Sequence, residues 1–512
     1  MLNHSLLPLP HPQKNRQKRS ALLSSIFYIT LTAPLLIGSM LIGQAAAQTQ
    51  AQTQNFNHDR PTDNLNPIAD YTHNETSSDR VKRPVVPAKQ SGEAVEIEIS
   101  TQGLENNPAL LMSLLQTVIA ENNIPAMGAL LPAYKRLPEH YQDPMLIHYM
   151  EGMVAKEHLD YSKAIAHFNA MLEETPDLPK IEVSLLEANL ANRAHRDAEE
   201  IIEKLERYPL DDGSREALQS YQDYINKRES FEFDLGLNYT EDRNINGAPP
   251  IGANANGFVS ITEAESAHGI SYFFSAKKDY NLSGQHYFRT KGELYGQYYW
   301  DNRTYNEVTA RVYAGYGYQT FGTSIFVTPF YEKRWFSQKP YAHSVGLRVS
   351  VDQMLSPKWQ WMNMAEFRHE TYDQQRDFLD GDRFMIATTL LYAPSNDQFF
   401  FGGLDFSKES PSDESDQYIR RGIRVGWGKQ WPNEFSTNVQ ASYAKRAYKG
   451  EDITRIQRRQ DEYTLSLSVW KRDIEFWGIT PKLSINWQKT SGNHPLYNYD
   501  RFKWYLDFSR AL

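Results

Sequence analysis

Three short stretches of this sequence carry side chains that could do chemistry. His369 and Glu370 are adjacent, and a histidine with an acidic partner can act as a general base, as could His286. The acidic stretch SKESPSDESD, at residues 407–416, offers carboxylates that could bind Ca²⁺. The stretch DRNIN, at residues 242–246, groups Asp and Asn side chains that can hydrogen-bond neighbouring backbone.

The first two stretches do not combine into a catalytic or metal site. No nucleophile stands at a readable spacing from the histidines, and a solvated surface loop accounts for the acidic stretch. The chain has no cysteine, which excludes thiol catalysis and thiolate metal sites, and it has no glycine-rich phosphate loop. We therefore expect no enzyme, no cofactor and no bound metal.

The first part of the chain predicts export from the cytoplasm. A basic stretch, KNRQKR, precedes a long apolar run and the small residues AAA at 45–47, so residues 1–47 are predicted to be a cleaved signal peptide. A retained membrane anchor is the alternative. Residues 48–95 are rich in Gln, Asn, Thr and Asp and predict a disordered linker. The net charge of −9 gives no reason to expect nucleic-acid binding.

Residues 96–228 have apolar side chains at helical spacing, with an internal period of 34 residues. Ala164, Phe168 and Met171 recur as Ala198, Ile202 and Leu205, and one period earlier as Leu130, Tyr134 and Leu137. Small and aromatic residues four apart at this period are typical of tetratricopeptide repeats, with a generic array of helical hairpins as the alternative. Either arrangement is a small α-solenoid that can bind peptide or protein. The predicted contacts to a substrate polypeptide are Tyr134, Tyr149 and Tyr161.

From residue 229 to 512 the apolar residues alternate with polar ones. In residues 419–428, Ile423, Val425 and Trp427 alternate with Arg424 and glycines, and the last twelve residues, RFKWYLDFSRAL, have the same pattern. A soluble β-sandwich also alternates. However, the segments are about 11–16 residues long, which suits a tilted membrane crossing, and Tyr and Trp gather at their ends.

The connections between these segments alternate between long and short. Long ones are predicted near residues 241–268, 371–381, 408–417, 449–460 and 489–497, and shorter ones on the same side near 301–303 and 337–340. Tight turns are predicted near residues 281–284, 320–322, 356–358, 394–397, 431–433 and 471–473. Short turns at one rim and longer loops at the other are typical of outer-membrane barrels. We therefore predict α plus transmembrane β: a helical solenoid followed by a 14-stranded antiparallel barrel, whose last strand pairs with its first.

The polar face of this predicted barrel carries many cations. Their side chains are expected to face the lumen, where water meets the charge, because charge on the lipid face would cost about 2–4 kcal/mol at mid-membrane. The predicted lumen-lining residues are Arg289, Lys291, Arg311, Arg420, Arg424, Arg501 and Lys503.

The DRNIN stretch gives the chain a family resemblance. A secretion signal, a short tetratricopeptide-like region, a 14-strand barrel and D-x-N-I-N after the first strand together resemble the surface lipoprotein assembly modifier family. The alternative for this motif alone is a turn at a strand end. The motif residues predicted to contact substrate are Asp242, Asn244 and Asn246, and the 241–268 loop is predicted to gate the pore.

The resemblance implies an outer-membrane translocon for surface lipoproteins or secreted haem- or metal-acquisition proteins. Implied partners are that substrate, periplasmic chaperones, the barrel-assembly machinery and outer-membrane lipid, with the barrel itself a monomer. The alternative function is a repeat-coupled pore for exopolysaccharide export or solute uptake. A neighbouring glycosyltransferase gene cluster would favour that alternative, and a gene for a small surface or haem-binding protein the translocon.

Overall fold

The computed structural model describes residues 103–373, 376–476 and 479–511. The predicted signal peptide (1–47) and linker (48–95) lie outside these residues. The chain forms two compact units, one of helices and one built on a barrel, which are described separately. This confirms the predicted fold class.

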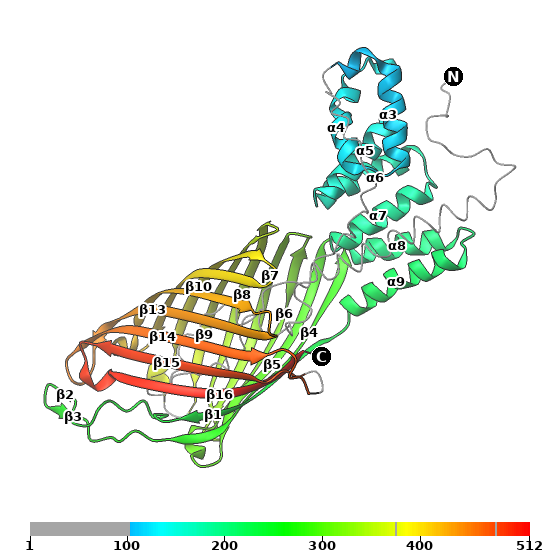
Figure 1. The fold of residues 1–512 in the computed structure, drawn as a ribbon. Helices are drawn as coiled ribbons and strands as arrows, with labels where there is room; N and C mark the ends of the chain where they lie inside the picture. Colours follow the sequence, from blue (N-terminus) through cyan, green and yellow to red (C-terminus); the bar gives the residue numbers. More distant parts are fainter. Residues whose placement is uncertain (1–102, 374–375, 477–478, 512) are drawn as a thin grey trace. The chain divides into compact units, whose positions relative to one another are not determined.

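The helical unit is a series of short helices, labelled in Figure 1. They are η1 (Leu104–Asn106), α3 (Pro108–Ala120), α4 (Ile124–Lys135), η2 (Glu139–Tyr141), α5 (Pro144–Glu157), α6 (Tyr161–Glu174), α7 (Pro179–Ala191), α8 (His195–Glu206) and α9 (Asp212–Arg228). Asn and Asp side chains cap several of them; Asp211, for example, accepts a 2.8 Å hydrogen bond from Ser214 N at the start of α9. Among the described residues, no helix combines the length and the apolar character needed to cross a membrane.

The 34-residue period corresponds to the buried side of the second helix of each hairpin. Ala164, Phe168 and Met171 of α6 are buried, as are Ala198, Ile202 and Leu205 of α8. At Gly152 of α5 a Cβ atom would lie 2.6 Å from the Phe168 ring, so only glycine allows this approach of α5 and α6. The 34-residue period therefore marks the residues that pack between neighbouring helices. A second core joins α7, α8 and α9 through residues such as Leu186, Ile202 and Tyr221.

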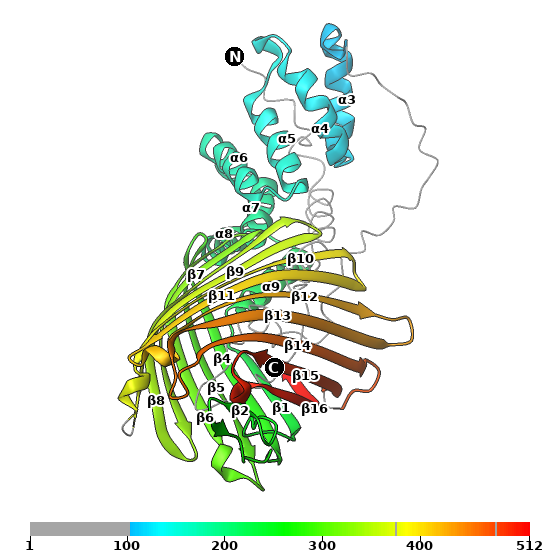
Figure 2. The ribbon, with the colours of Figure 1, turned by 90° about the vertical axis from the view of Figure 1, so that its left-hand side faces the viewer.

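The barrel consists of fourteen antiparallel strands closed by pairing of β1 with β16 (Figure 2). Its strands are β1 (Glu232–Asp242), β4 (Ala267–Ser283), β5 (His286–Tyr299), β6 (Glu307–Gln319), β7 (Thr323–Phe336), β8 (Lys339–Ser356), β9 (Trp359–Tyr372), β10 (Gly381–Ser395), β11 (Gln398–Pro411), β12 (Tyr418–Gln430), β13 (Phe435–Glu451), β14 (Gln457–Lys471), β15 (Lys482–Gly492) and β16 (Tyr499–Ala511). The predicted pairing of the last strand with the first is confirmed, which leaves the ring without an open edge.

The outer face of the barrel is apolar. Val312 is 57% exposed and Val345 is 61% exposed, whereas the polar residues between such positions are mostly buried. Aromatic rings stack on the outside near the strand ends, where Tyr239 lies 6.0 Å from Trp300 and 5.6 Å from Trp504 between ring centroids. An apolar outer band with aromatic ends is the surface of a barrel that spans a membrane.

The connections alternate broadly as predicted, with two differences. Residues 337–338 form a two-residue turn in which Ser337 and Gln338 both have positive φ, as in a tight hairpin. The predicted tight turn at 471–473 is wrong, because β14 ends at Lys471 and β15 begins only at Lys482. The connection between them contains an isolated bridge of its own, between Phe476 and Ile479.

The long β1–β4 connection contains a small hairpin of its own, β2 (Asn254–Ala255) paired with β3 (Phe258–Val259). Short 3₁₀ turns lie in other connections at the same rim: η3 (Arg303–Tyr305), η4 (Asp377–Leu379), η5 (Glu414–Asp416) and η6 (Pro495–Tyr497). Apart from the β14–β15 connection, the longer and more structured connections therefore gather at one end of the barrel.

Candidate functional site

The seam between the first and last strands is held by one carboxylate and two cations. Asp242, at the end of β1, is opposite Lys503 of β16 in the strand register. Its Oδ1 accepts a 3.0 Å hydrogen bond from Arg501 Nε, and its Oδ2 lies 2.8 Å from Lys503 Nζ. Arg501 Nη2 also contacts Oδ2. All three side chains are almost fully buried, so the cations depend on Asp242 for compensation.

The rest of the DRNIN stretch folds the loop that follows the seam. The Asn244 side chain donates to Ala248 O (3.0 Å) and accepts from Ala248 N (2.8 Å). Asn246 makes the matching pair with the other end of the loop, donating to Glu263 O (2.8 Å) and accepting from Glu265 N (3.0 Å). The two asparagines therefore fix where the loop leaves β1 and where it returns.

Ile245 is the apolar anchor of the same motif. It is fully buried and packs with Ala267 and Tyr299, the first residue of β4 and the last of β5. Its N–H donates to Glu265 O at 2.9 Å. Asp242, Asn244, Ile245 and Asn246 thus each have a partner in the barrel or its loop, and the predicted contact of the motif with substrate stays a prediction.

The β1–β4 loop also reaches another connection of the rim. Asn256 Nδ2 donates to Thr454 O at 2.9 Å. Thr454 Oγ1 lies 2.8 Å from His494 Nε2, and this nitrogen lies 2.9 Å from Asp452 Oδ2. Burial lowers the pKa of His494, which favours the neutral ring. The loop is therefore tied to the β13–β14 connection and, through His494, to the β15–β16 connection.

Each cation predicted to line the lumen is paired with a carboxylate. Arg289 makes two 2.7 Å hydrogen bonds to Asp279, and Lys291 Nζ lies 2.5 Å from Glu293 Oε1. Arg311 Nη2 lies 2.5 Å from Glu332 Oε2. The prediction that these charges are stabilised by water is therefore incomplete, because anions on the same face compensate them directly.

These pairs join into networks that cross several strands. On one wall, Arg311 (β6) also contacts Glu366 (β9) at 3.2 Å, and Arg348 (β8) contacts the same carboxylate at 2.7 Å. On a second part of the wall, beyond β10, Arg420 (β12) pairs with Asp405 (β11) and, at 2.8 Å, with Glu462 (β14).

Arg424 belongs to the second network. Its Nη1 lies 3.4 Å from Asp405 Oδ1, and its Nη2 donates to Thr389 Oγ1 at 2.8 Å. The apolar neighbours Ile423 and Val425 are half exposed on the other face. The alternation places Arg424 inside and Val425 outside the barrel wall.

The histidine and acid considered for catalysis lie on opposite faces of β9. His369 is exposed and pairs with Asp382 at 2.8 Å, whereas Glu370 is buried near Arg368. His286 begins β5. The structure therefore does not bring His369 and Glu370 together.

The three tyrosines proposed to contact substrate lie in the packed helical core. Tyr134, Tyr149 and Tyr161 are each at most 3% exposed. The Tyr134 hydroxyl accepts from Asp143 N at 2.8 Å and donates to Tyr141 O at 3.2 Å. Their rings hold helices together and are not presented to a polypeptide in this conformation.

The acidic partners were missed by sequence reasoning, which noted only the cations. They are Asp242, Asp279, Glu293, Glu332, Glu366, Asp405 and Glu462. The sequence singles out Asp242 only as part of the DRNIN stretch, not as a partner of these cations. A signal for these carboxylates was available: they occupy the same alternate positions of their strands as the other buried polar residues, as Glu366 and Arg368 do in β9.

Sequence comparison assigns both units to one family. A family model described as "Surface lipoprotein assembly modifier" matches residues 231–512, and a second, described as its N-terminal TPR repeats, matches residues 97–202. The chain belongs to the surface lipoprotein assembly modifier family. The D-x-N-I-N resemblance is thereby confirmed at the level of the family, and the barrel is an outer-membrane barrel.

Curated relatives match across most of the chain. "Surface lipoprotein assembly modifier 1" of Haemophilus influenzae is 33% identical over 81% of this chain and 88% of its own length. "Surface lipoprotein assembly modifier" of Pasteurella multocida is 30% identical over 88% of this chain and 93% of its own. "Hemophilin secretion modulator" of Acinetobacter baumannii is 24% identical over 80% of this chain and 86% of its own. The match to these relatives thus extends over both the helical region and the barrel region of this chain.

Proposed function

We propose that this protein is an outer-membrane translocon that delivers surface lipoproteins, or related secreted haem- or metal-acquisition proteins, across the outer membrane. The observation that carries the proposal is the family match over both the repeats and the barrel. The relatives include a lipoprotein assembly modifier and a hemophilin secretion modulator. These names favour protein translocation over a polysaccharide or solute pore.

The two units have separate tasks in this proposal. An even number of strands brings both ends of the barrel to the same side of the membrane, and the tight turns mark that side as the periplasm. Residues 96–228 then act in the periplasm, after removal of residues 1–47 and a linker at 48–95, and residues 229–512 form the membrane path. The helices receive an unfolded or chaperone-held substrate and pass it to the barrel.

The energy for transport comes from the substrate. The outer membrane has no ATP supply, and the sequence has no glycine-rich phosphate loop. Folding of the substrate outside the cell makes its passage irreversible. The barrel works as a monomer, and the barrel-assembly machinery inserts it after binding its last strand.

The decisive experiment removes the receptor and keeps the barrel. A chain with residues 107–224 deleted is expected to reach the outer membrane and show heat-modifiable mobility, yet to leave its substrate off the cell surface. Surface proteomics of a deletion strain first identifies the substrate. Normal display of that substrate by the truncated protein would refute the receptor role of the helices.

A further inference from the structure

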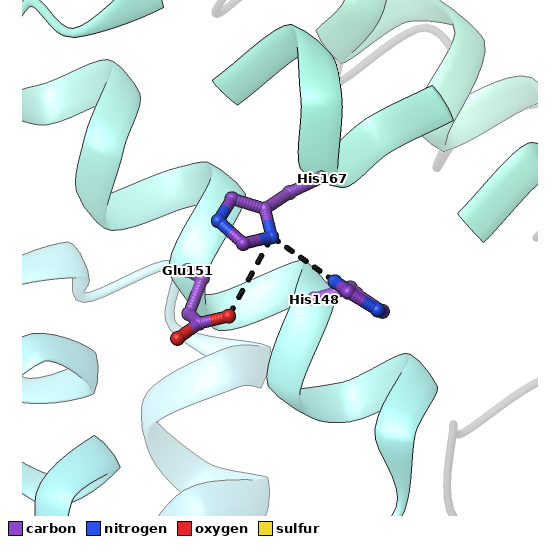
Figure 3. Close-up of side chains that lie close together, drawn as sticks. All are labelled: His148, Glu151 and His167. Atoms are coloured by element: carbon purple, nitrogen blue, oxygen red, sulfur yellow. Dashed lines mark hydrogen bonds and ion pairs between the residues drawn. The ribbon is translucent and has the colours of Figure 1, made fainter. Parts of the chain in front are cut away.

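Two histidines and one glutamate converge between α5 and α6 (Figure 3). His148 and Glu151 are three residues apart on α5 and therefore share one face of it, and His167 of α6 points toward both. The two imidazole Nδ1 atoms are 3.0 Å apart, and His167 Nδ1 lies 3.5 Å from Glu151 Oε2. One ligand atom from each residue lies within 4.8 Å of the other two.

These separations match the edges of a metal coordination shell. Zinc binds imidazole nitrogen and carboxylate oxygen at about 2.0–2.2 Å, so two ligands of a tetrahedral ion lie about 3.3 Å apart. The observed 3.0 and 3.5 Å lie on either side of that value. Two imidazoles and a carboxylate favour a divalent transition metal over Ca²⁺ or Mg²⁺, which prefer oxygen ligands.

The surroundings prepare these side chains for a cation. Lys135 of α4 pairs with Glu151 Oε1, which leaves Oε2 directed at His167. Such an outer partner orients a ligating carboxylate. His167 and Glu151 are 25% and 22% exposed, so water can reach the group.

We propose that His148, Glu151 and His167 bind a divalent transition-metal ion such as Zn²⁺, with the remaining coordination position open to water. The ion joins α5 to α6 at the hairpin where Gly152 already contacts Phe168, and through Lys135 it reaches α4. This site is independent of the transport proposal, because its test measures metal binding and helix stability.

The test uses the whole mature protein in detergent, without a histidine tag and stripped of metal by a chelator. Co²⁺ is the probe, because tetrahedral Co²⁺ absorbs visibly, and Zn²⁺ is then added in competition. Wild type is expected to show saturable binding near one equivalent and a Zn²⁺-dependent rise in the melting temperature of its helical circular dichroism. The double variant His148→Asn/His167→Asn loses both effects, whereas His158→Asn, at the exposed end of α5, keeps them.

Two more measurements separate a metal site from a simple side-chain contact. Lys135→Met keeps all three ligands, so Zn²⁺ affinity is expected to fall by about 10–100-fold without being abolished. Affinity is also expected to fall between pH 7.5 and 5.5 as the imidazoles become protonated. Absence of saturable binding in wild type, or equal binding in the double variant with unchanged helical signal, overturns the proposal.

Discussion

At the scale of single residues, the informative position is one carboxylate, Asp242. The sequence predicts that Asp242 belongs to a loop motif that contacts substrate, together with the neighbouring asparagines. The structure gives it two buried cations from the last strand of the barrel, Arg501 and Lys503. That contact joins residues 259 positions apart, so no local pattern could reveal it.

We predict that Asp242→Asn strongly destabilises the barrel. Removing one partner leaves buried cations without compensation, which typically costs about 3–5 kcal/mol. Urea unfolding of the refolded barrel in lipid vesicles measures the loss. Asp382→Asn is the matched control, because Asp382 is an exposed carboxylate paired with His369, and its loss is expected to stay below about 1 kcal/mol. Equal losses in the two variants would show that the seam does not depend on Asp242.

A second residue-scale prediction tests which face meets lipid. Val425→Arg puts a charge on the exposed apolar face of β12, with an expected penalty of about 2–4 kcal/mol near mid-membrane and reduced insertion. Arg424→Ala is expected to assemble, because Asp405 keeps Arg420 as a partner. The fraction of each variant that becomes heat-modifiable in outer-membrane preparations is the readout, and indistinguishable fractions would contradict the assignment of faces.

At the scale of elements, the periodicity of the sequence predicts the helices and strands reliably, whereas the lengths of the connections are predicted less well. The 34-residue period and the period-two alternation depend on repeated burial of one side, which the packing of α5 to α9 and of fourteen strands reproduces. The predicted turn at 471–473 is wrong because the connection has its own bridge, between Phe476 and Ile479, before β15 begins. The three tyrosines are buried between helices, where an aromatic ring of a repeat serves packing, and their contact with substrate stays a prediction.

The helical hairpin gives a prediction at this scale. Gly152→Leu forces a side chain against Phe168, so the helical unit is expected to lose about 1–3 kcal/mol, or more if α5 and α6 separate. Gly128→Ala in α4 is the control, since its Cβ would meet Val154 at an ordinary 3.5 Å and alanine favours helix. Thermal melting of the helical dichroism compares them; a Gly152→Leu melt at the wild-type temperature argues against the close packing.

At the scale of the whole molecule, the β1–β4 loop connects the seam to the rest of the rim. The hydrogen bond from Asn256 to Thr454 ties the loop to the β13–β14 connection, and Asn246 holds the segment that leads back to β4. The contacts that hold this loop come from several connections of the rim, which explains why a motif could locate the loop but not its partners.

We predict that the loop restricts the pore. Replacing residues 248–262 by a short Gly-Ser linker keeps Asp242, Asn246 and Glu265 and is expected to raise single-channel conductance and sensitivity to large antibiotics. Asn256→Gly, which removes the contact to Thr454 and suits the positive φ of this position, is expected to give a smaller increase. If both variants match wild type in conductance, sensitivity and substrate display, the loop has no gating role.

The buried ion triad at the seam has a consequence for biogenesis. Among the barrel's strand pairs, β1 with β16 has by far the greatest separation along the chain, and contacts of high sequence separation form late. Asp242 therefore meets Arg501 and Lys503 only when β16 pairs with β1. A chain that lacks β16 never acquires its countercharges, so the stabilisation of ring closure is available only to complete barrels. We therefore expect the triad to stabilise complete barrels and not truncated ones.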